Sequence, residues 1–209
     1  MLTIMHCFFL LCVNVLMVTA QVCKTPSPPP ADTFNLSSFW GNWYEIARIQ
    51  TAGGNAIQQF CACTNLIYTP AANTNSSDLS NTDVTNSCRF ETASGFWLNA
   101  SSYLIDGGAE GGHWVETYCP PGLSGCPLAS YNVIIEGNDT RGVPYFVEYD
   151  CSTSIIGESN YCLHFLSREP LGFDTNLLQA LIYNTTVLMK LNPENRVVNI
   201  TMQDEGCWN

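Results

Sequence analysis

Between positions 40 and 168 the sequence alternates between short segments rich in β-branched and aromatic residues and clusters of Gly, Pro, Asn, Asp and Ser. Such alternation is typical of β-strands joined by turns. We expect strands near residues 41–50, 62–69, 82–93, 95–106, 113–119, 129–137, 144–151 and 160–168. Eight consecutive strands favour an all-β fold, an up-and-down antiparallel β-barrel, because closing the sheet removes its exposed edges.

The pattern changes after the eighth strand. Pro170 and Asp174 are typical of a helix start, and apolar residues recur at helical spacing over 177–182. The sequence therefore predicts one α-helix after the barrel. A short C-terminal strand is expected at 196–202, shortly before Cys207.

The first twenty residues have the pattern of a secretory signal peptide. They are almost continuously apolar over 7–17 and end in Val-Thr-Ala, so we expect cleavage before Gln21. A membrane anchor is the alternative, but this run is shorter than the ~20 residues that a spanning helix needs. The expected organisation is a signal peptide at 1–20, a proline-rich lead-in at 21–35 and one barrel domain at 36–209. We expect a secreted, extracellular protein with no stable membrane insertion.

Charge and glycosylation motifs are consistent with this location. The net charge is −11 with seven Lys and Arg residues, so an electrostatic grip on nucleic acid is not expected. N-glycosylation motifs begin at Asn35, Asn75, Asn99, Asn138, Asn184 and Asn199. Each glycosylated position has to face solvent.

Nine cysteines follow the signal peptide, and in an oxidising compartment they predict disulfides. A zinc site is the alternative, but the chain has no Cys-x-x-Cys pair, and His113 and His164 are far apart in sequence. We therefore expect no metal. The odd number leaves at least one cysteine without an intramolecular partner.

Two disulfides are suggested by local sequence. Cys119 and Cys126 bracket a Pro-Pro-Gly turn, which suits a small loop bridge. If the second hairpin turns around 73–77, Cys61 and Cys88 face each other across an antiparallel pair. Cys162 then remains free.

Two short motifs resemble the lipocalin family. Gly41-Asn42-Trp43, continued by Tyr-Glu-Ile, resembles the first signature, and Leu166-Ser167-Arg168 resembles the third. The resemblance implies that Arg168 packs over Trp43 and closes the barrel floor, a cation–π contact of roughly 1–2 kcal/mol. The family's second signature is absent, because the corresponding turn at 138–142 reads Asn-Asp-Thr-Arg-Gly.

The segments at 149–151 and 201–207 are similar to the branch that contains apolipoprotein D, insect bilin-binding protein and crustacyanin. That resemblance implies two disulfides that tie terminal segments to the barrel, Cys23–Cys151 and Cys63–Cys207. Cys61–Cys207 is the alternative if the second strand is shifted by two residues.

The resemblance also implies a ligand-binding cavity, the calyx, inside the barrel. Alternation from Trp43 directs Glu45 and Ala47 inward, and alternation from Arg168 directs the cysteine and histidine of the eighth strand inward. An outward Asn99 turns Phe96, Leu98, Ala100 and Leu104 inward. The calyx residues expected here are Glu45, Tyr68, Leu98, Cys162 and His164.

The expected function is that of a carrier for a small hydrophobic ligand: a lipid, sterol, retinoid, carotenoid or bilin. No cofactor is required. Few inward cations are expected beyond Arg168. A ligand with two carboxylates would therefore have to place them at the rim of the barrel or pair them with His113 or Arg89. Two interpretations of His164 and Cys162 remain open. Both residues can be ordinary packed core residues. Alternatively, the Cys162 thiol contacts the ligand, and the His164 imidazole accepts the proton of that thiol.

Two other classes of function remain open in the sequence. One is a lipocalin isomerase that uses a calyx thiol, for which Cys61 or Cys63 lies in the right region; both have expected disulfide partners, so we expect no catalysis. The other is a secreted interaction protein whose surface matters more than its cavity. The sequence does not indicate an oligomeric state.

Overall fold

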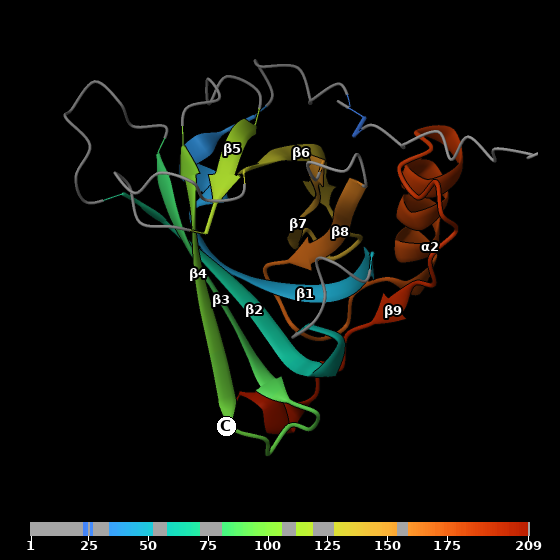
Figure 1. The fold of residues 1–209 in the computed structure, drawn as a ribbon. Coiled ribbons are helices and arrows are strands. Elements are labelled where there is room, and N and C mark those ends of the chain that lie inside the picture. The colour runs from blue at the N-terminus through green and yellow to red at the C-terminus, as the bar shows by residue number, and fades with distance from the viewer. Residues whose placement is uncertain are drawn as a thin grey trace, which may run out of the picture.

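The computed structural model describes residues 23–24, 26, 34–51, 58–71, 81–105, 112–118, 128–153 and 159–208. The barrel strands are β1 (Gly41–Gln50), β2 (Cys61–Pro70), β3 (Thr82–Phe90), β4 (Trp97–Ile105), β5 (His113–Thr117), β6 (Leu128–Asn138), β7 (Pro144–Thr153) and β8 (Ser159–Ser167). Consecutive strands pair antiparallel, and β8 returns to pair with β1 (Figure 1). The prediction of a closed eight-stranded up-and-down barrel is confirmed.

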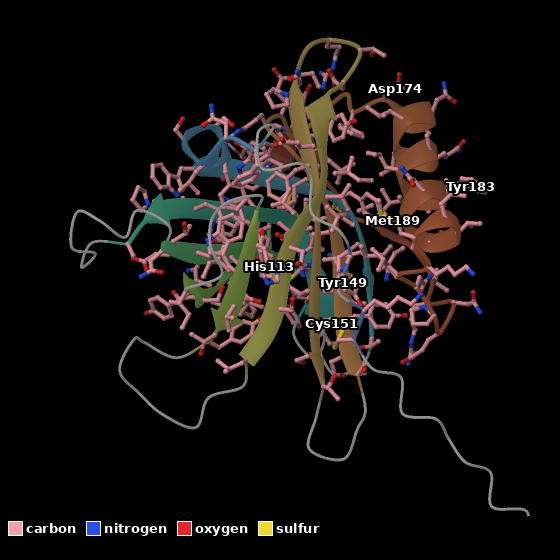
Figure 2. The ribbon with its side chains drawn as sticks, turned by 90° about the horizontal axis from the view of Figure 1, so that it is seen from above. His113, Tyr149, Cys151, Asp174, Tyr183 and Met189 are labelled. Carbon is pink, nitrogen blue, oxygen red and sulfur yellow. A yellow bond between two sulfur atoms is a disulfide. The ribbon has the colours of Figure 1, made fainter. Side chains whose placement is uncertain are left out.

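One α-helix follows the barrel, as predicted. In α2 (Thr175–Tyr183) the Asp174 side chain accepts hydrogen bonds from the backbone N–H groups of residues 176 and 177, which satisfies donors at the helix start. The helix continues as one π-helical segment, η3 (Asn184–Leu188). Figure 2 shows α2 lying along the outside of the barrel wall, with Tyr183 at its end.

Three short helical elements lie outside the barrel strands and α2. The helix α1 (Leu36–Phe39), capped by Asn35, was not expected from the sequence. The turns η2 (Gln58–Phe60) and η4 (Glu205–Cys207) are single 3₁₀ turns.

The C-terminal strand β9 (Asn199–Ile200) is shorter than the predicted 196–202. It pairs with β1 at Ala47 and Arg48, beyond the last β1–β2 pair. The chain then crosses to β2, where the Cys63 N–H donates to the Met202 carbonyl at 2.8 Å. Because the backbone changes partner there, the strand ends after two residues.

Two apolar layers hold the structure together. Outside the barrel, Leu178 and Leu181 of α2 pack on outward side chains of the wall, including Ile49, Leu163 and Phe165. Inside it, aromatic and aliphatic residues fill one end, and these are Phe39, Trp43, Leu66, Tyr68, Val84, Leu104, Trp114, Tyr131, Val133, Phe146 and Leu166. This end is called the floor below.

Disulfides anchor both terminal segments. The bonded pairs are Cys23–Cys151, Cys61–Cys88 and Cys63–Cys207, three of the four that the sequence suggested. The alternative pair Cys61–Cys207 is not formed. Cys162 is free and buried. Cys119 and Cys126 lie outside the described residues.

Most expected glycosylation positions lie at the surface. Asn35, Asn99, Asn138 and Asn199 are exposed and Asn184 is partly exposed. Asn75, the signal peptide and most of the lead-in lie outside the described residues, so these expectations stay predictions. None of the helices in the described part of the chain is long and apolar enough to cross a membrane.

Candidate ligand-binding site

Arg168 and Trp43 seal the floor together. The Arg168 guanidinium carbon lies 3.7 Å from the centroid of the Trp43 ring, and Nη1 donates to the Asn42 carbonyl at 2.7 Å. The Trp43 indole N–H donates to the Phe39 carbonyl at 2.7 Å. Gly41 has φ +109°, and a Cβ there would lie 2.9 Å from Arg168 Nη1. The glycine of the motif is therefore required both by its backbone conformation and by the approach of the arginine.

Helix α1 covers the floor from below. Its Phe39 ring stacks on Trp114 with centroids 5.2 Å apart and lies 4.4 Å from the ring of Tyr68. Phe39 thus fills the centre of the barrel end.

A β-bulge in β1 changes which side chains face the interior. The register with β8 shifts between Glu45, which pairs with Leu166, and Ala47, which pairs with Phe165. Alternation therefore fails across the bulge. The expectation that Ala47 faces the calyx is wrong, because this residue packs in the layer between the barrel and α2. Arg48 takes the inward position opposite His164, so an inward cation was missed.

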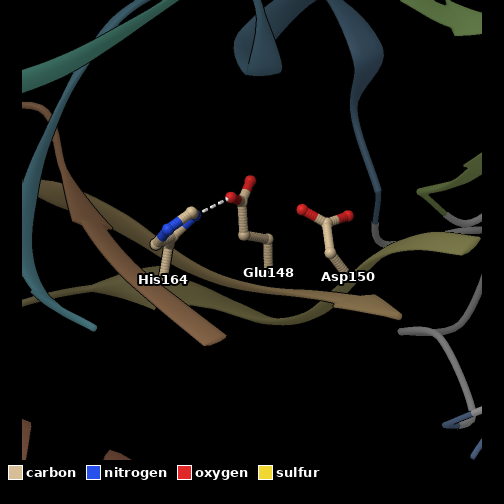
Figure 3. A group of neighbouring side chains, drawn as sticks. All are labelled: Glu148, Asp150 and His164. Carbon is tan, nitrogen blue, oxygen red and sulfur yellow. Dashed lines mark hydrogen bonds and ion pairs between the residues drawn. The ribbon is translucent and has the colours of Figure 1, made fainter. Parts of the chain in front are cut away.

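Four strands bring two rows of inward residues side by side, because directly paired residues share a face of the sheet. The lower rung, nearer the floor, consists of Val133, Glu148, His164 and Arg48. The upper rung consists of Tyr131, Asp150, Cys162 and Gln50. Figure 3 shows the Glu148, Asp150 and His164 side chains on the same face of β7 and β8.

The lower rung forms a network of paired charges together with Glu45 of β1. Glu148 accepts hydrogen bonds from the hydroxyls of Tyr68, at 2.8 Å, and Tyr131, and it also contacts His164 Nδ1. On the other side, His164 Nε2 lies 3.4 Å from one Glu45 oxygen, and the other Glu45 oxygen accepts from Arg48 at 2.6 Å.

The charge of His164 follows from these contacts. Burial by itself lowers the pKa of the imidazole, but the negative charges around it, above all Cys162 as thiolate and Glu148, together with hydrogen bonds to both, hold that pKa well above its usual value. Because burial keeps the thiol protonated near neutral pH, as described below, Glu148 is the partner that counts there. With Glu45 included, this network thus contains two carboxylates balanced by one guanidinium and one imidazolium.

The upper rung, in contrast, contains the carboxyl of Asp150 and no cation; the nearest cation is His164 of the lower rung, with ligand atoms of the two residues within 4.8 Å of each other. Asp150 Oδ1 and Gln50 Oε1 are buried and have no hydrogen-bond partner among the described residues. Glu116 of β5 is buried nearby and accepts a 3.4 Å hydrogen bond from Tyr118. Burial raises the pKa of Glu116 to about 7; burial and then the charge of Glu116 raise the pKa of Asp150 well above its usual value.

Cys162 completes a row of thiol, imidazole and carboxylate. Its Sγ lies 2.8 Å from His164 Nε2, and Nδ1 of the same ring faces Glu148. This is the order of groups found in nucleophilic catalysis. Burial raises the thiol pKa, however, and a protonated imidazole has no lone pair with which to accept the thiol proton. The row therefore rests as a buried ion pair beside a neutral thiol.

Of the expected calyx residues, Glu45, Tyr68, Cys162 and His164 meet in this network. Leu98 lies apart from this network. It is near the start of β4, at the end of the barrel away from the floor, where it pairs with Cys88 and is partly buried. The expectation that Phe96 faces inward is wrong: it is 63% exposed and stacks on Phe90 with centroids 5.2 Å apart.

The two side chains suggested for a dicarboxylate ligand are occupied elsewhere. Arg89 lies 4.4 Å over the Trp97 ring, and His113 hydrogen-bonds Asn132.

Sequence reasoning missed Arg48, Gln50, Glu116, Glu148 and Asp150. The spacing of Phe146, Glu148 and Asp150 was a usable signal, since alternation places all three on one face of a strand.

A separate cavity of about 670 Å³ lies at the floor, between α1 and the β6–β7 hairpin. Its lining includes Phe34, Phe39, Val133, Glu136 and Tyr145, and none of the expected calyx residues. It therefore touches the lower rung only at Val133 and lies apart from the charged residues of both rungs.

Solved structures resemble this fold at low sequence identity. Insecticyanin from the tobacco hornworm Manduca sexta gives a TM-score of 0.59 at 17% identity, over 89% of this chain and 88% of that one. Lobster apocrustacyanin A1 gives 0.56 at 16%, over 89% and 92%. An odorant-binding protein gives 0.53 at 8%, over 80% and 92%. No family model and no curated protein matches the sequence.

These similarities agree with the closed barrel and the helix on its outer wall. The chain has the lipocalin fold.

Proposed function

We propose that this protein is an extracellular carrier that binds one small, largely hydrophobic molecule in the upper half of the barrel. The observation that carries the proposal is a closed eight-stranded barrel whose floor is sealed by Trp43, Phe39 and Arg168. A barrel of this size has room for one small ligand above such a floor. One structurally similar protein is, by its name, a binder of odorants.

The described cations argue against ligands with two free carboxylates, such as a bilin with ionised acids. Arg48 is paired with Glu45, and His164 is paired with Glu148. Neutral lipids, sterols, retinoids or carotenoids need no such partner. Burial of a few hundred Å² at ~25 cal/mol/Å², less the entropy of association, supports micromolar to nanomolar affinity.

The proposed ligand-facing residues are Glu45, Tyr68, Leu98, Cys162 and His164. Leu98 shares a face of β4 with the buried Leu104, which places it on the inner surface towards the open end. Secretion is supported by three disulfides, which persist in oxidising compartments.

Catalysis of the isomerase type lacks its nucleophile at the positions considered from the sequence. Cys61 and Cys63 are both in disulfides and have no thiolate to offer. We therefore propose binding rather than catalysis.

The test is native mass spectrometry of the full-length protein secreted from eukaryotic cells, followed by solvent extraction. We expect a small apolar molecule bound at one copy per chain, which a neutral fluorescent naphthylamine displaces.

Ala100→Trp places a large side chain on the inner face of β4 and should abolish probe binding. Thr85→Trp, on the outer face of β3, is the matched control and should leave it unchanged. Absence of both a native ligand and probe binding would contradict the proposal.

A further inference from the structure

We propose that the ligand of this calyx carries a protonated amine, which Asp150 and Glu116 bind together with the side-chain carbonyl of Gln50. This inference rests on the proposed carrier function and specifies the chemistry of its ligand.

The first argument is the balance of charge inside the barrel. The inward ionisable groups in the described interior are the carboxyls of Glu45, Glu116, Glu148 and Asp150, and the cations of Arg48 and His164. The lower rung pairs both cations with two of the carboxyls. Asp150 and Glu116 remain without a cation of their own, because the nearest described one, His164, is already paired with Glu148. A positively charged ligand is the complement that this arrangement lacks.

The second argument is the set of unused acceptor atoms. Gln50 is only 6% exposed, its Nε2 donates to the side-chain oxygen of Gln58, and its Oε1 accepts from no described donor. Asp150 Oδ1 is in the same condition. A buried acceptor without a donor is costly, and native structures avoid it. An ammonium group presents three N–H donors and no acceptor, so it suits this set of oxygens.

The third argument is position. Asp150 pairs with Cys162, which pairs with Gln50, so both unused oxygens belong to residues of the upper rung. Glu116 pairs with Ala129, which shares a face of β6 with Tyr131, and Tyr131 pairs with Asp150, so Glu116 lies one row beyond Asp150 on the inner surface. The acceptors thus lie beyond the lower rung, on the side towards the open end of the barrel.

A metal ion is a weaker candidate for the same place. Ligand atoms of Glu148, Asp150 and His164 lie within 4.8 Å of one another, as Figure 3 shows for their common face. The oxygens of Glu148, however, already accept from Tyr68, Tyr131 and His164. A metal would have to break these bonds, whereas an amine uses oxygens that are free.

The experiment compares matched ligands by titration calorimetry on the intact protein at about pH 8, above the pKa of about 7 of Glu116. One pair is 2-phenylethylamine and 2-phenylethanol; the other is dodecylamine and dodecanol. We expect at least one amine to bind about tenfold to hundredfold more tightly than its alcohol, the range for a hydrogen bond to a charged group. This comparison needs no variant.

Variants then locate the preference. Asp150→Asn and Glu116→Gln should each reduce the amine preference and leave alcohol binding unchanged. Glu205→Gln removes a negative charge from the surface and should alter neither. A circular dichroism spectrum checks that each variant is folded. If Asp150→Asn does not fold, Glu116→Gln alone tests the amine preference.

The outcomes separate the two proposals. Equal affinity for amine and alcohol in both pairs overturns the amine inference but leaves the carrier function standing. Failure of all four ligands and of the naphthylamine probe overturns both. Zinc chloride that binds alone and is lost in Glu148→Gln would assign the site to a metal and overturn the amine inference.

Discussion

At the scale of single residues, the floor depends on three positions. Gly41 lets the arginine approach, Trp43 offers its ring face, and Arg168 both covers the ring and donates to backbone carbonyls, including that of Trp40 at 2.6 Å. The guanidinium is half-buried, and burial lowers its pKa without removing its charge at neutral pH. These residues act as one unit rather than as separate contacts.

The prediction at this scale concerns the floor pair. Trp43→Ala should lower the free energy of unfolding by ~3–5 kcal/mol because it leaves a cavity, and Arg168→Ala should lower it by a smaller amount. The double variant should cost less than the sum, because each single change already removes the shared contact. Urea denaturation measures all three, with Arg196→Ala as a surface control. Strictly additive costs would contradict a single floor unit.

At the scale of elements, the C-terminal tail covers the place where β1 and β2 separate. Gln203 Nε2 donates to the carbonyls of Glu45 at 3.0 Å and Thr64 at 2.7 Å, so one side chain bridges both strands. The Cys63–Cys207 bond fixes the end of the tail, and Trp208 packs edge-on against Tyr44 with centroids 4.8 Å apart. Figure 1 shows the C-terminus beside the hairpin of β3 and β4.

The prediction for elements compares two disulfides. The Cys63–Cys207 bond spans 144 residues and Cys61–Cys88 spans 27. In the chain-entropy description the longer loop restricts the unfolded chain more, so Cys63→Ser with Cys207→Ser should cost about 1–2 kcal/mol more than Cys61→Ser with Cys88→Ser.

Urea denaturation of the two double variants measures the difference. Hydrogen exchange should accelerate at residues 201–208 only in the variant that lacks the Cys63–Cys207 bond. Equal stabilities with an unchanged tail would show that the tail is held by its hydrogen bonds alone.

At the scale of the whole molecule, the interior is divided into an apolar floor and a charged upper half. The titratable groups around Glu116 and Asp150 are Tyr68, Tyr118, Tyr131, Glu148, Cys162 and His164. The pKa of each tyrosine and of the thiol is raised by its surroundings, so these groups stay neutral near pH 7. The pH response of the ligand-free protein therefore depends on the carboxyls and the imidazole.

The prediction for the whole molecule is that the ligand-free protein loses stability as the pH rises from about 5 to 8. Glu116 and Asp150 have raised pKa values, so the folded state binds more protons than the unfolded state, and deprotonation at higher pH costs stability. His164 has the same sign, since its stabilisation exists below its unfolded pKa and is lost as the pH rises through the folded value. Glu116 alone, with its pKa raised from 4.5 to about 7, contributes roughly 3 kcal/mol.

Thermal unfolding at several pH values tests this. Glu116→Gln should flatten the dependence, and Glu205→Gln should not. A melting temperature that rises from pH 5 to 8 would show that the carboxyls ionise at their ordinary pKa values.

Local patterns in the sequence were sufficient for the strand order, the closed barrel and the following helix. Each strand is recognised from a period of two and from turn residues at its ends, and both signals come from neighbouring positions. The floor pair and the bonds of Cys151 and Cys207 were expected from the family resemblance, and Cys61–Cys88 from the expected turn of the second hairpin.

The charged interior was decided by the tertiary structure. A single bulge after Glu45 exchanges the inward and outward positions along the rest of β1 relative to simple alternation. The local sequence pattern does not predict this bulge. Which side chains then meet depends on the register of four strands, and register joins residues far apart in sequence. Arg48, Glu148 and Asp150 therefore read as ordinary alternating strand residues in the sequence. Only the closed barrel brings them to one face, where too little solvent remains to screen their charges.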